Sequence, residues 1–208
     1  RLLDRQGRIT LDTPEALRAL ENYRETYSYS DRTIYDFWKN ALEGFADGTA
    51  AMTVVFINYA SHILNSQMSR IAGKLGFAPV PGGKPLLGGG VIGIAQSCTC
   101  PAAACKFLEW LYADLVAPVF TMLGGLSPCR SAYSNRDISE QYPWLSTARK
   151  SFPTAQRRSN STYYQNFSEL QLETILAAHV QQAVLGVCSP EEALKQAQED
   201  CNRYFQPW

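Results

Sequence analysis

The amino-acid sequence predicts an α/β fold in which a mixed sheet is flanked by helices. Apolar residues recur at helical spacing in some segments, and short β-branched or Gly-rich apolar runs separate these segments. Hydrophobic residues make up 46% of the 208 residues and charged residues 18%, which is typical of a globular protein. A chain of this length can form one substantial domain or two small ones.

Two helices are predicted before residue 46. Thr13 is a suitable N-cap for the first, Pro14 fits its first helical position, and Glu15 complements the helix dipole. Residues 34–45 form the second, because apolar side chains recur there on one helical face.

The junction at residues 45–56 is the most informative stretch of the chain. A polar, Gly-containing turn ends the second helix and leads through small residues into a Val-Val-Phe run, so residues 51–57 are predicted to form a strand. A helix over 61–70 follows. Residues 75–83 are predicted as a short strand that enters a Pro/Gly turn, and the Gly-rich segment 86–95 as a further strand.

The second half of the chain is predicted to be mainly helical. Pro101 begins a helix, and an irregular stretch is expected over 127–162. Residues 172–187 follow the helical i, i+3, i+4 pattern and stop near a glycine. Ser189 then starts a last helix as its N-cap, with Pro at the first helical position and Glu at the third.

Charge and hydropathy argue against two classes of partner. Lys plus Arg and Asp plus Glu number 19 each, so the chain has no basic surplus for nucleic acid or an anionic membrane. Its apolar runs are too short to span a bilayer. The sequence opens on Arg1 without a signal peptide or a Met, and we expect a processed product or a fragment.

The six cysteines allow three interpretations. An even number would suit disulfides in a secreted protein, although a chain of this size does not need them. Cys98, Cys100 and Cys105 are spaced almost as zinc ligands, but neither His62 nor His179 lies near them. We favour scattered, buried cysteines in a reducing compartment, with no metal site.

Catalytic and nucleotide-binding functions are not supported by the motifs. Residues 88–93 satisfy G-x-G-x-x-G, but β-branched strand sequence follows where a dinucleotide site requires a helix. The glycines can instead let the chain approach a ligand or a neighbouring backbone closely. Neither histidine has an acidic neighbour in sequence, and no hydrolase or P-loop motif is present. We expect a protein that is not an enzyme and uses no cofactor.

Aromatic residues favour a carbohydrate ligand. They make up 12% of the chain, and several are expected at loops or strand ends. Sugars present apolar C–H faces edged with hydroxyl groups, which aromatic rings beside Asn, Asp or Arg can bind. About half of these rings are expected to be core residues instead. The residues concerned are Phe56, Tyr59, Tyr133, Tyr142, Trp144, Tyr163 and Tyr164.

Five blocks, in order along the chain, resemble one known family. They are G-R-I-T-L-D-T-P-E-A at 7–16, F-A-D-G-T-A-A-M at 45–52, the P-V-P-G and G-G-G-V-I-G-I segments within 79–94, G-G-L-S-P-C-R at 124–130, and S-P-E-E-A-L at 189–194. In this order they resemble the C-terminal half of the bacterial extracellular solute-binding proteins of family 1. That carbohydrate-binding group includes maltose-binding protein.

The resemblance implies a periplasmic-binding-protein type II-like fold, with residues 1–208 forming mainly the C-terminal lobe. It also implies ligand-facing groups after the 51–52 pair, at the glycine run and at the Arg of the fourth block; Tyr163 is added from the aromatic residues. The candidate ligand-binding residues are Phe56, Asn58, Tyr59, Gly88, Gly89, Gly90, Arg130 and Tyr163.

The resemblance further implies a function that this chain does not perform alone. The family binds a small solute, here expected to be a sugar or oligosaccharide, by closing two lobes, and passes it to the permease subunits of an ABC importer. Residues 92–123 would cross to the missing N-terminal lobe or pack elsewhere, such as across a dimer. Such a receptor would be extracellular, as a membrane-anchored lipoprotein or in the periplasm. The alternative is the sensor domain of a cytoplasmic transcription regulator.

Overall fold

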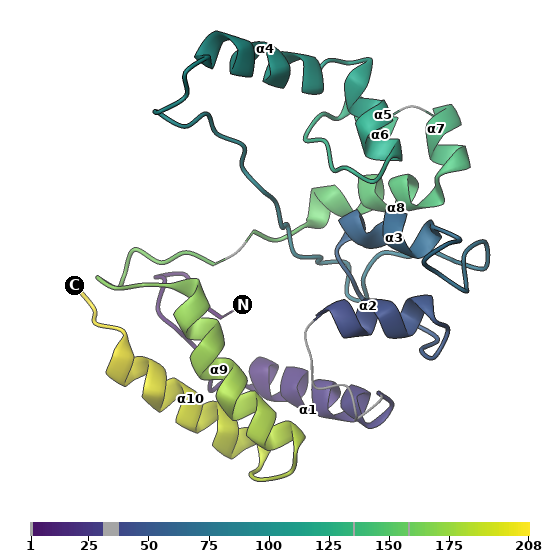
Figure 1. The fold of residues 1–208 in the computed structure, drawn as a ribbon. Helices are drawn as coiled ribbons and strands as arrows, with labels where there is room; N and C mark the ends of the chain where they lie inside the picture. The colour runs from purple at the N-terminus through teal and green to yellow at the C-terminus, as the bar shows by residue number, and fades with distance from the viewer. Residues whose placement is uncertain (1, 31–37, 135, 158) are drawn as a thin grey trace. The chain divides into compact units, whose positions relative to one another are not determined.

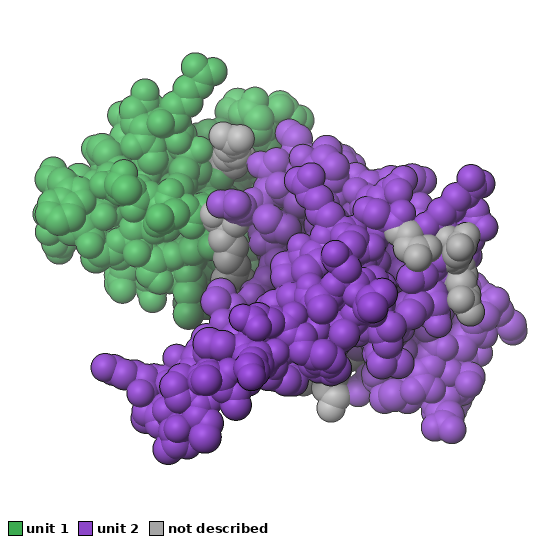
Figure 2. Space-filling model, turned by 90° about the horizontal axis from the view of Figure 1, so that it is seen from above, with its two compact units in different colours: residues 1–35, 158–208 green, residues 36–157 purple. Residues whose placement is uncertain are grey.

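A computed structural model describes residues 2–30, 38–134, 136–157 and 159–208 (Figure 1). The chain divides into two compact units (Figure 2). Unit 1 combines Arg1–Tyr35 with Arg158–Trp208, and unit 2 is Asp36–Arg157. Among the helices of the described ranges, none is long and apolar enough to cross a membrane.

In its described residues, unit 1 contains three helices, α1 (Pro14–Ser28), α9 (Glu169–Val184) and α10 (Pro190–Tyr204). α9 packs along α10, and α1 packs against both. One core joins Leu20 of α1 to Ala183 of α9 and Leu194 of α10. A second core joins the N-terminal residues Ile9 and Leu11 to the same helix pair. Each of the three helices therefore contributes buried side chains to the cores of the unit.

The predicted N-terminal ends of α1 and α10 are confirmed. Thr13 Oγ1 accepts a hydrogen bond from the Ala16 N–H at 3.2 Å, and α1 begins at Pro14. Ser189 Oγ accepts from the Glu192 N–H at 3.1 Å and starts α10. Local capping chemistry alone specifies these ends, which explains why the sequence reveals them.

Unit 2 consists of short helices joined by long extended segments. Its elements are α2 (Trp38–Ala46), η1 (Ile57–Tyr59), α3 (Ala60–Leu64), α4 (Pro101–Leu111), α5 (Val116–Met122), α6 (Ser131–Ser134), α7 (Arg136–Gln141), α8 (Pro143–Ser151) and η2 (Phe152–Thr154). Its core contains Ala60, Ala117, Tyr133, Trp144 and Leu145, contributed by α3, α5, α6 and α8. Residues 34–37 of the predicted second helix lie outside the described residues.

The predicted mixed sheet is not formed. Within the described ranges, strand pairing consists of three isolated bridges, Leu3 with Ile9, Leu86 with Gln156, and Tyr164 with Pro207. Residues 51–56 and 87–94 form no strand, although their sequence is typical of strands. A strand is stabilised by pairing with a neighbour along its length. In the described residues, such pairing is limited to one bond at the start of the second segment, from the Leu87 N–H to the Gln156 carbonyl.

Other predicted element boundaries were also wrong. The stretch expected to be irregular, 127–162, contains α6, α7, α8 and η2. The helix predicted over 61–70 ends at Leu64, after which the chain forms turns. Pro143 and Pro153 each lie in the first turn of a helix, the position that proline favours, although prolines in such a stretch are also typical of loops.

Residues 91–123 carry most of the exposed apolar surface of unit 2. Val91 is 99% exposed and Leu115 is 88% exposed. On α4, Phe107 and Trp110 lie side by side with their ring centroids 5.8 Å apart, and both are exposed. Leu111, at the end of α4, is buried, so this helix has one face on the unit and another open. Exposed apolar side chains are therefore frequent in this segment, and two of them, Phe107 and Trp110, lie together on the open face of α4.

Candidate functional site

The turn at Gly48 directs the chain from α2 into the candidate site. The Gly48 N–H donates to the Phe45 carbonyl at 3.0 Å, and the Thr49 N–H donates to the Gly44 carbonyl at 3.0 Å. This is the Schellman pattern, and it requires the φ of +82° that Gly48 adopts. The extended residues that follow lead to Phe56, as the sequence predicts, although they form no strand.

Phe56 and Gly88 lie in contact, although they are far apart in the sequence. A Cβ atom placed on Gly88 would lie 3.0 Å from Cε1 of the Phe56 ring and 3.5 Å from its Cδ1. The ring therefore rests on the Gly88 backbone, and any side chain there would displace it. Phe56 is still 49% exposed, so part of the ring remains available to a ligand.

The glycine run is held in place next to Phe56 by a short backbone pairing. The Leu87 N–H donates to the Gln156 carbonyl, and the Gln156 N–H donates to the Pro85 carbonyl, both at 2.7 Å. No described atom would lie within 4 Å of a Cβ added to Gly89 or Gly90. The run therefore presents bare backbone, with its peptide groups exposed, beside an aromatic ring.

Asn58 and Tyr59 lie on η1, directly after Phe56. The Tyr59 N–H donates to the Phe56 carbonyl at 3.0 Å, which turns the chain into α3. Ile57 packs against the core of unit 2, whereas Asn58 is exposed. Burial of Ile57 and Ala60 on one side thus fixes a turn that carries Phe56 and Asn58 on its exposed part.

Arg130 is exposed and lies just before α6. Its carbonyl accepts hydrogen bonds from the Tyr133 N–H at 3.0 Å and from Ser134 Oγ at 2.9 Å. Its neighbours Cys129 and Ala132 pack in the same core as Ile57 and Ala60. Arg130 and the η1 turn therefore belong to elements that share one core.

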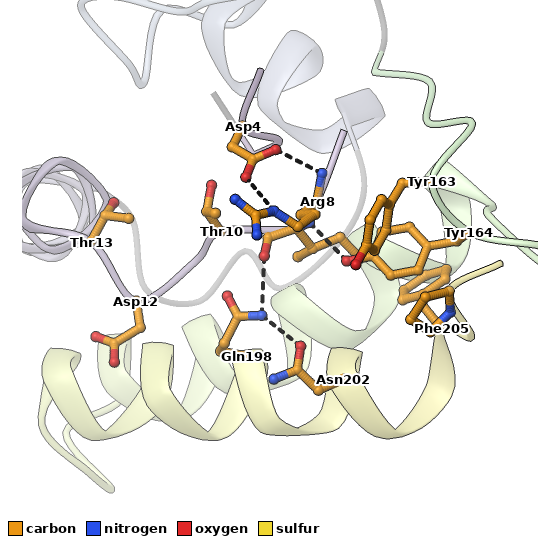
Figure 3. A pocket seen from close by; sticks show the side chains of 12 residues that line it. Asp4, Arg8, Thr10, Asp12, Thr13, Tyr163, Tyr164, Gln198, Asn202 and Phe205 are labelled. Atoms are coloured by element: carbon orange, nitrogen blue, oxygen red, sulfur yellow. Dashed lines mark hydrogen bonds and ion pairs between the residues drawn. The ribbon is translucent and has the colours of Figure 1, made fainter. Parts of the chain in front are cut away.

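Tyr163 belongs to unit 1, unlike the other candidate residues. Its ring lies on one side of a surface hollow of about 500 Å³ (Figure 3). The turn at Asp4–Arg8 and helix α10 form the other sides. The ring meets Tyr164 edge-on, with centroids 4.9 Å apart, and Tyr163 is 37% exposed.

The turn beside this hollow is stabilised by Asp4. Its carboxylate accepts hydrogen bonds from the N–H groups of Gln6 and Arg8, each at 2.9 Å, and from Arg8 Nε at 2.8 Å. Desolvation raises the pKa of Asp4, but the bonds from Arg8 and Gln6 outweigh it and hold the pKa below its usual value. The bond to Asp4 in turn raises the pKa of Arg8.

The sequence does not reveal a histidine–aspartate pair, because its members are adjacent only in space. His179 Nε2 lies 2.8 Å from Asp200 Oδ2 and joins α9 to α10. The His179 side chain is 14% exposed, and its Nδ1 has no hydrogen-bond partner among the described residues. The hydrogen bond from His179 lowers the pKa of Asp200. This pair serves to connect two helices.

The cysteines are less buried than the sequence suggested. All six are free thiols, and only Cys201 is fully buried, whereas Cys100 and Cys105 are exposed. Burial raises the pKa of the Cys201 thiol to about 11, which keeps it protonated. In the described part of the chain, no group of three or more His, Cys, Asp or Glu side chains is arranged to hold a metal ion.

The sequence of residues 4–147 matches the family described as "Bacterial extracellular solute-binding protein". Maltose-bound MalE3 of T. maritima is similar in structure, with a TM-score of 0.78 and 23% identity; the match covers 98% of this chain and 54% of that chain.

Two ABC transporter solute-binding proteins share the fold as well. The protein from Agrobacterium radiobacter K84, in complex with ribitol, gives a TM-score of 0.70 at 21% identity, with 98% of this chain and 53% of that chain covered. The protein from Agrobacterium vitis S4, with bound D-mannitol, gives a TM-score of 0.69 at 22% identity, and the match covers 98% of this chain and 54% of that chain. The chain thus spans about half the length of these similar structures.

Proposed function

Because the chain belongs to the bacterial extracellular solute-binding proteins, we propose that it forms one wall of a binding site for a neutral sugar or polyol. The observation that carries this proposal is the exposed Phe56 ring resting on Gly88, beside the open backbone of Gly89 and Gly90. An aromatic face next to bare peptide groups offers both apolar contact and hydrogen bonds to a hydroxylated ligand.

Each candidate residue of unit 2 has a definite role in this site. The Phe56 ring stacks on a C–H face of the ligand, and Asn58 donates to and accepts from its hydroxyl groups. The peptide groups of Gly89 and Gly90 bond to further hydroxyls. Arg130 contributes charged donors, which bond more strongly than neutral ones. Tyr59 adds a second aromatic surface.

The exposed apolar surface over residues 92–123 fits a chain that functions together with a second lobe. We assign this segment to the contact with that lobe, which supplies the opposite wall of the site. Three similar structures contain maltose, ribitol and D-mannitol, and this supports a neutral, hydroxyl-rich ligand.

The wider role follows from the family. Because the family is described as extracellular, we favour a receptor outside the cytoplasm over a cytoplasmic sensor domain. Such a receptor delivers its solute to the permease subunits of an ABC importer. A lipid anchor would retain it at the membrane surface. The family consists of binding proteins, which agrees with a function without catalysis.

A thermal-shift series tests the ligand class. The chain is heated with maltose, ribitol or D-mannitol, and with L-lysine as a charged counterpart. A ligand that binds only the folded state raises the melting temperature with its concentration. We expect a concentration-dependent rise for at least one sugar or polyol and none for L-lysine. A rise for L-lysine alone, or for none of the four, would contradict the proposal.

A further inference from the structure

We propose that the hollow of unit 1, between the Asp4–Arg8 turn, Tyr163 and α10, is a second binding site for a neutral polyhydroxylated ligand. The hollow has a volume of about 500 Å³, which is within the range of small-molecule sites. It is separate in sequence and in unit from the Phe56 site, so it does not depend on the function proposed above.

The residues around the hollow are fixed before any ligand binds. Gly7 adopts a φ of +83°, which lets the turn close, and Ser161 Oγ donates to the Gly7 carbonyl at 2.6 Å. Tyr164 Oη accepts from the Ile9 N–H at 2.9 Å in a buried bond. The turn and the Tyr163–Tyr164 segment are therefore connected at two points, and little ordering is required on binding.

Gln198 of α10 fixes the other side of the hollow. Its Oε1 accepts from the Leu11 N–H at 2.7 Å, and its Nε2 donates to the Ile9 carbonyl at 3.2 Å and to Asn202 Oδ1 at 2.9 Å. Figure 3 shows the two bonds of Nε2; with the bond of Oε1, the amide nitrogen and oxygen of Gln198 are both used within the protein. It positions Asn202 for a ligand and leaves the Asn202 amide donors available.

Several polar groups around the hollow have no partner among the described residues. These groups are the Asn202 Nδ2 donors, the Asp12 carboxylate, the Tyr163 hydroxyl and the terminal nitrogens of Arg8. Hydrogen-bond donors and acceptors therefore both line the hollow. A hydroxyl group donates and accepts at once, so a ligand rich in hydroxyls matches this mixture better than a ligand with only donors or only acceptors.

The charges around the hollow exclude an anion as the preferred ligand. The Arg8 guanidinium is paired with Asp4 at 2.8 Å, which leaves the Asp12 carboxylate as the uncompensated charge. A carboxylate or phosphate ligand would meet like charge, whereas a neutral sugar or polyol would not. The Tyr163 ring supplies an aromatic surface for the C–H groups of such a ligand.

An NMR titration tests this site and distinguishes it from the Phe56 site. The ¹⁵N-labelled chain is titrated with D-glucose, with D-mannitol and with D-glucuronate as the anionic counterpart of glucose. We expect saturable amide shifts at Ile9, Thr10, Tyr163 and Asn202 for a neutral ligand, and weaker binding of D-glucuronate. These shifts should persist in Phe56→Ala, because Phe56 belongs to the other site.

Two variants of the hollow have matched controls. Tyr163→Ala should raise the Kd from the unit 1 shifts about fivefold or more, as expected for the loss of an aromatic contact. Tyr204→Ala is its control, because Tyr204 is also exposed and edge-on to a buried ring but does not line the hollow. Asn202→Asp keeps the oxygen that Gln198 bonds but removes the free donors, and should raise the Kd about fivefold.

Three results would overturn the proposal. The first is the absence of saturable shifts at the four unit 1 amides with both neutral ligands. The second is a Kd that Tyr163→Ala leaves unchanged. The third is tighter binding of D-glucuronate than of D-glucose. Because the Phe56 site has its own amides and its own variant, failure of one site is visible separately from failure of the other.

Discussion

The two units of this chain differ in how fully they cover their own apolar surface. In unit 1, helices α1, α9 and α10 bury Leu20, Leu172 and Leu194 among themselves. In unit 2, one core is closed around Trp144, whereas residues such as Val91 and Leu115 remain exposed. The helices of unit 1 therefore pack around shared cores, whereas unit 2 combines one closed core with a segment of exposed apolar side chains.

The two candidate sites differ in the same way in the residues that form them. In unit 1 the polar groups around the hollow are fixed by hydrogen bonds across the sequence, such as those of Gln198 and Ser161. In unit 2 the site consists of an exposed ring, Phe56, on bare glycine backbone. We therefore propose the first site as complete within its unit and the second as one wall of a larger site.

The largest effect is expected in the closed core of unit 2. Trp144→Ala removes a side chain that is almost fully buried, and the cavity should cost about 3–5 kcal/mol of unfolding free energy. Trp110→Ala is the matched control in the same unit, because Trp110 is exposed on α4, and it should change stability by about 0.5 kcal/mol or less. Urea unfolding measures both. Equal losses would show that the open face of α4 is packed in this chain.

The core of unit 1 allows the same comparison within one helix. Leu172→Ala should cost about 2–5 kcal/mol, because Leu172 is completely buried on α9. Leu170→Ala, two residues earlier and exposed, should cost little. The midpoint of urea unfolding at constant m-value reports the difference. If Leu170→Ala lowered the free energy of unfolding as much as Leu172→Ala, the assignment of Leu172 to the buried face of α9 and of Leu170 to its exposed face would be wrong.

A smaller effect is expected at the start of α10. Ser189→Ala removes the oxygen that accepts from the Glu192 N–H, and should cost about 1 kcal/mol. Ser189→Gly should cost only a few tenths of a kcal/mol, because glycine is tolerated at this position. Thermal unfolding of the two variants provides the measurement. The reverse order of stability would argue against the cap.

The smallest effect concerns the connection between α9 and α10 in acid. The bond from His179 holds the folded-state pKa of Asp200 below the unfolded value of 3.8. Stability from this carboxylate is therefore present above 3.8 and is lost as the pH falls through the lowered pKa. When the free energy of unfolding is measured over an acid pH series, the stability advantage of wild type over Asp200→Asn should shrink below pH 3.8. Glu199→Gln, on the same helix, is the control; an advantage that grows toward acid would contradict the assignment.

The sequence predicted those parts of the fold that depend on local chemistry. The caps at Thr13 and Ser189 and the turn at Gly48 are specified by residues within one helical turn. The prediction of a sheet was wrong because strand pairing depends on partners far along the chain. The strand-like sequence at 51–56 and 87–94 forms no strand in the structure. Local pattern cannot reveal whether a distant partner is present.

The candidate sites show the same limit. The family blocks pointed to Phe56 and to the glycine run, but the contact of the Phe56 ring with Gly88 became visible only in the structure. No sequence signal joined Asp4 and Arg8 to Tyr163 around one hollow, because these residues are far apart in the sequence. The pairing of His179 with Asp200 depends on how the successive helices α9 and α10 pack, which the local sequence pattern does not reveal.

The most direct test of the central claim is isothermal titration of the chain with maltose, comparing Phe56→Ala with Phe152→Ala. Both residues are exposed phenylalanines of unit 2, but Phe152 packs edge-on against Tyr133 and does not contact the glycine run. We predict that Phe56→Ala raises the Kd for maltose about tenfold, which corresponds to the loss of about 1.4 kcal/mol of stacking free energy. Phe152→Ala should leave this Kd unchanged. An equal Kd for Phe56→Ala and wild type would contradict it.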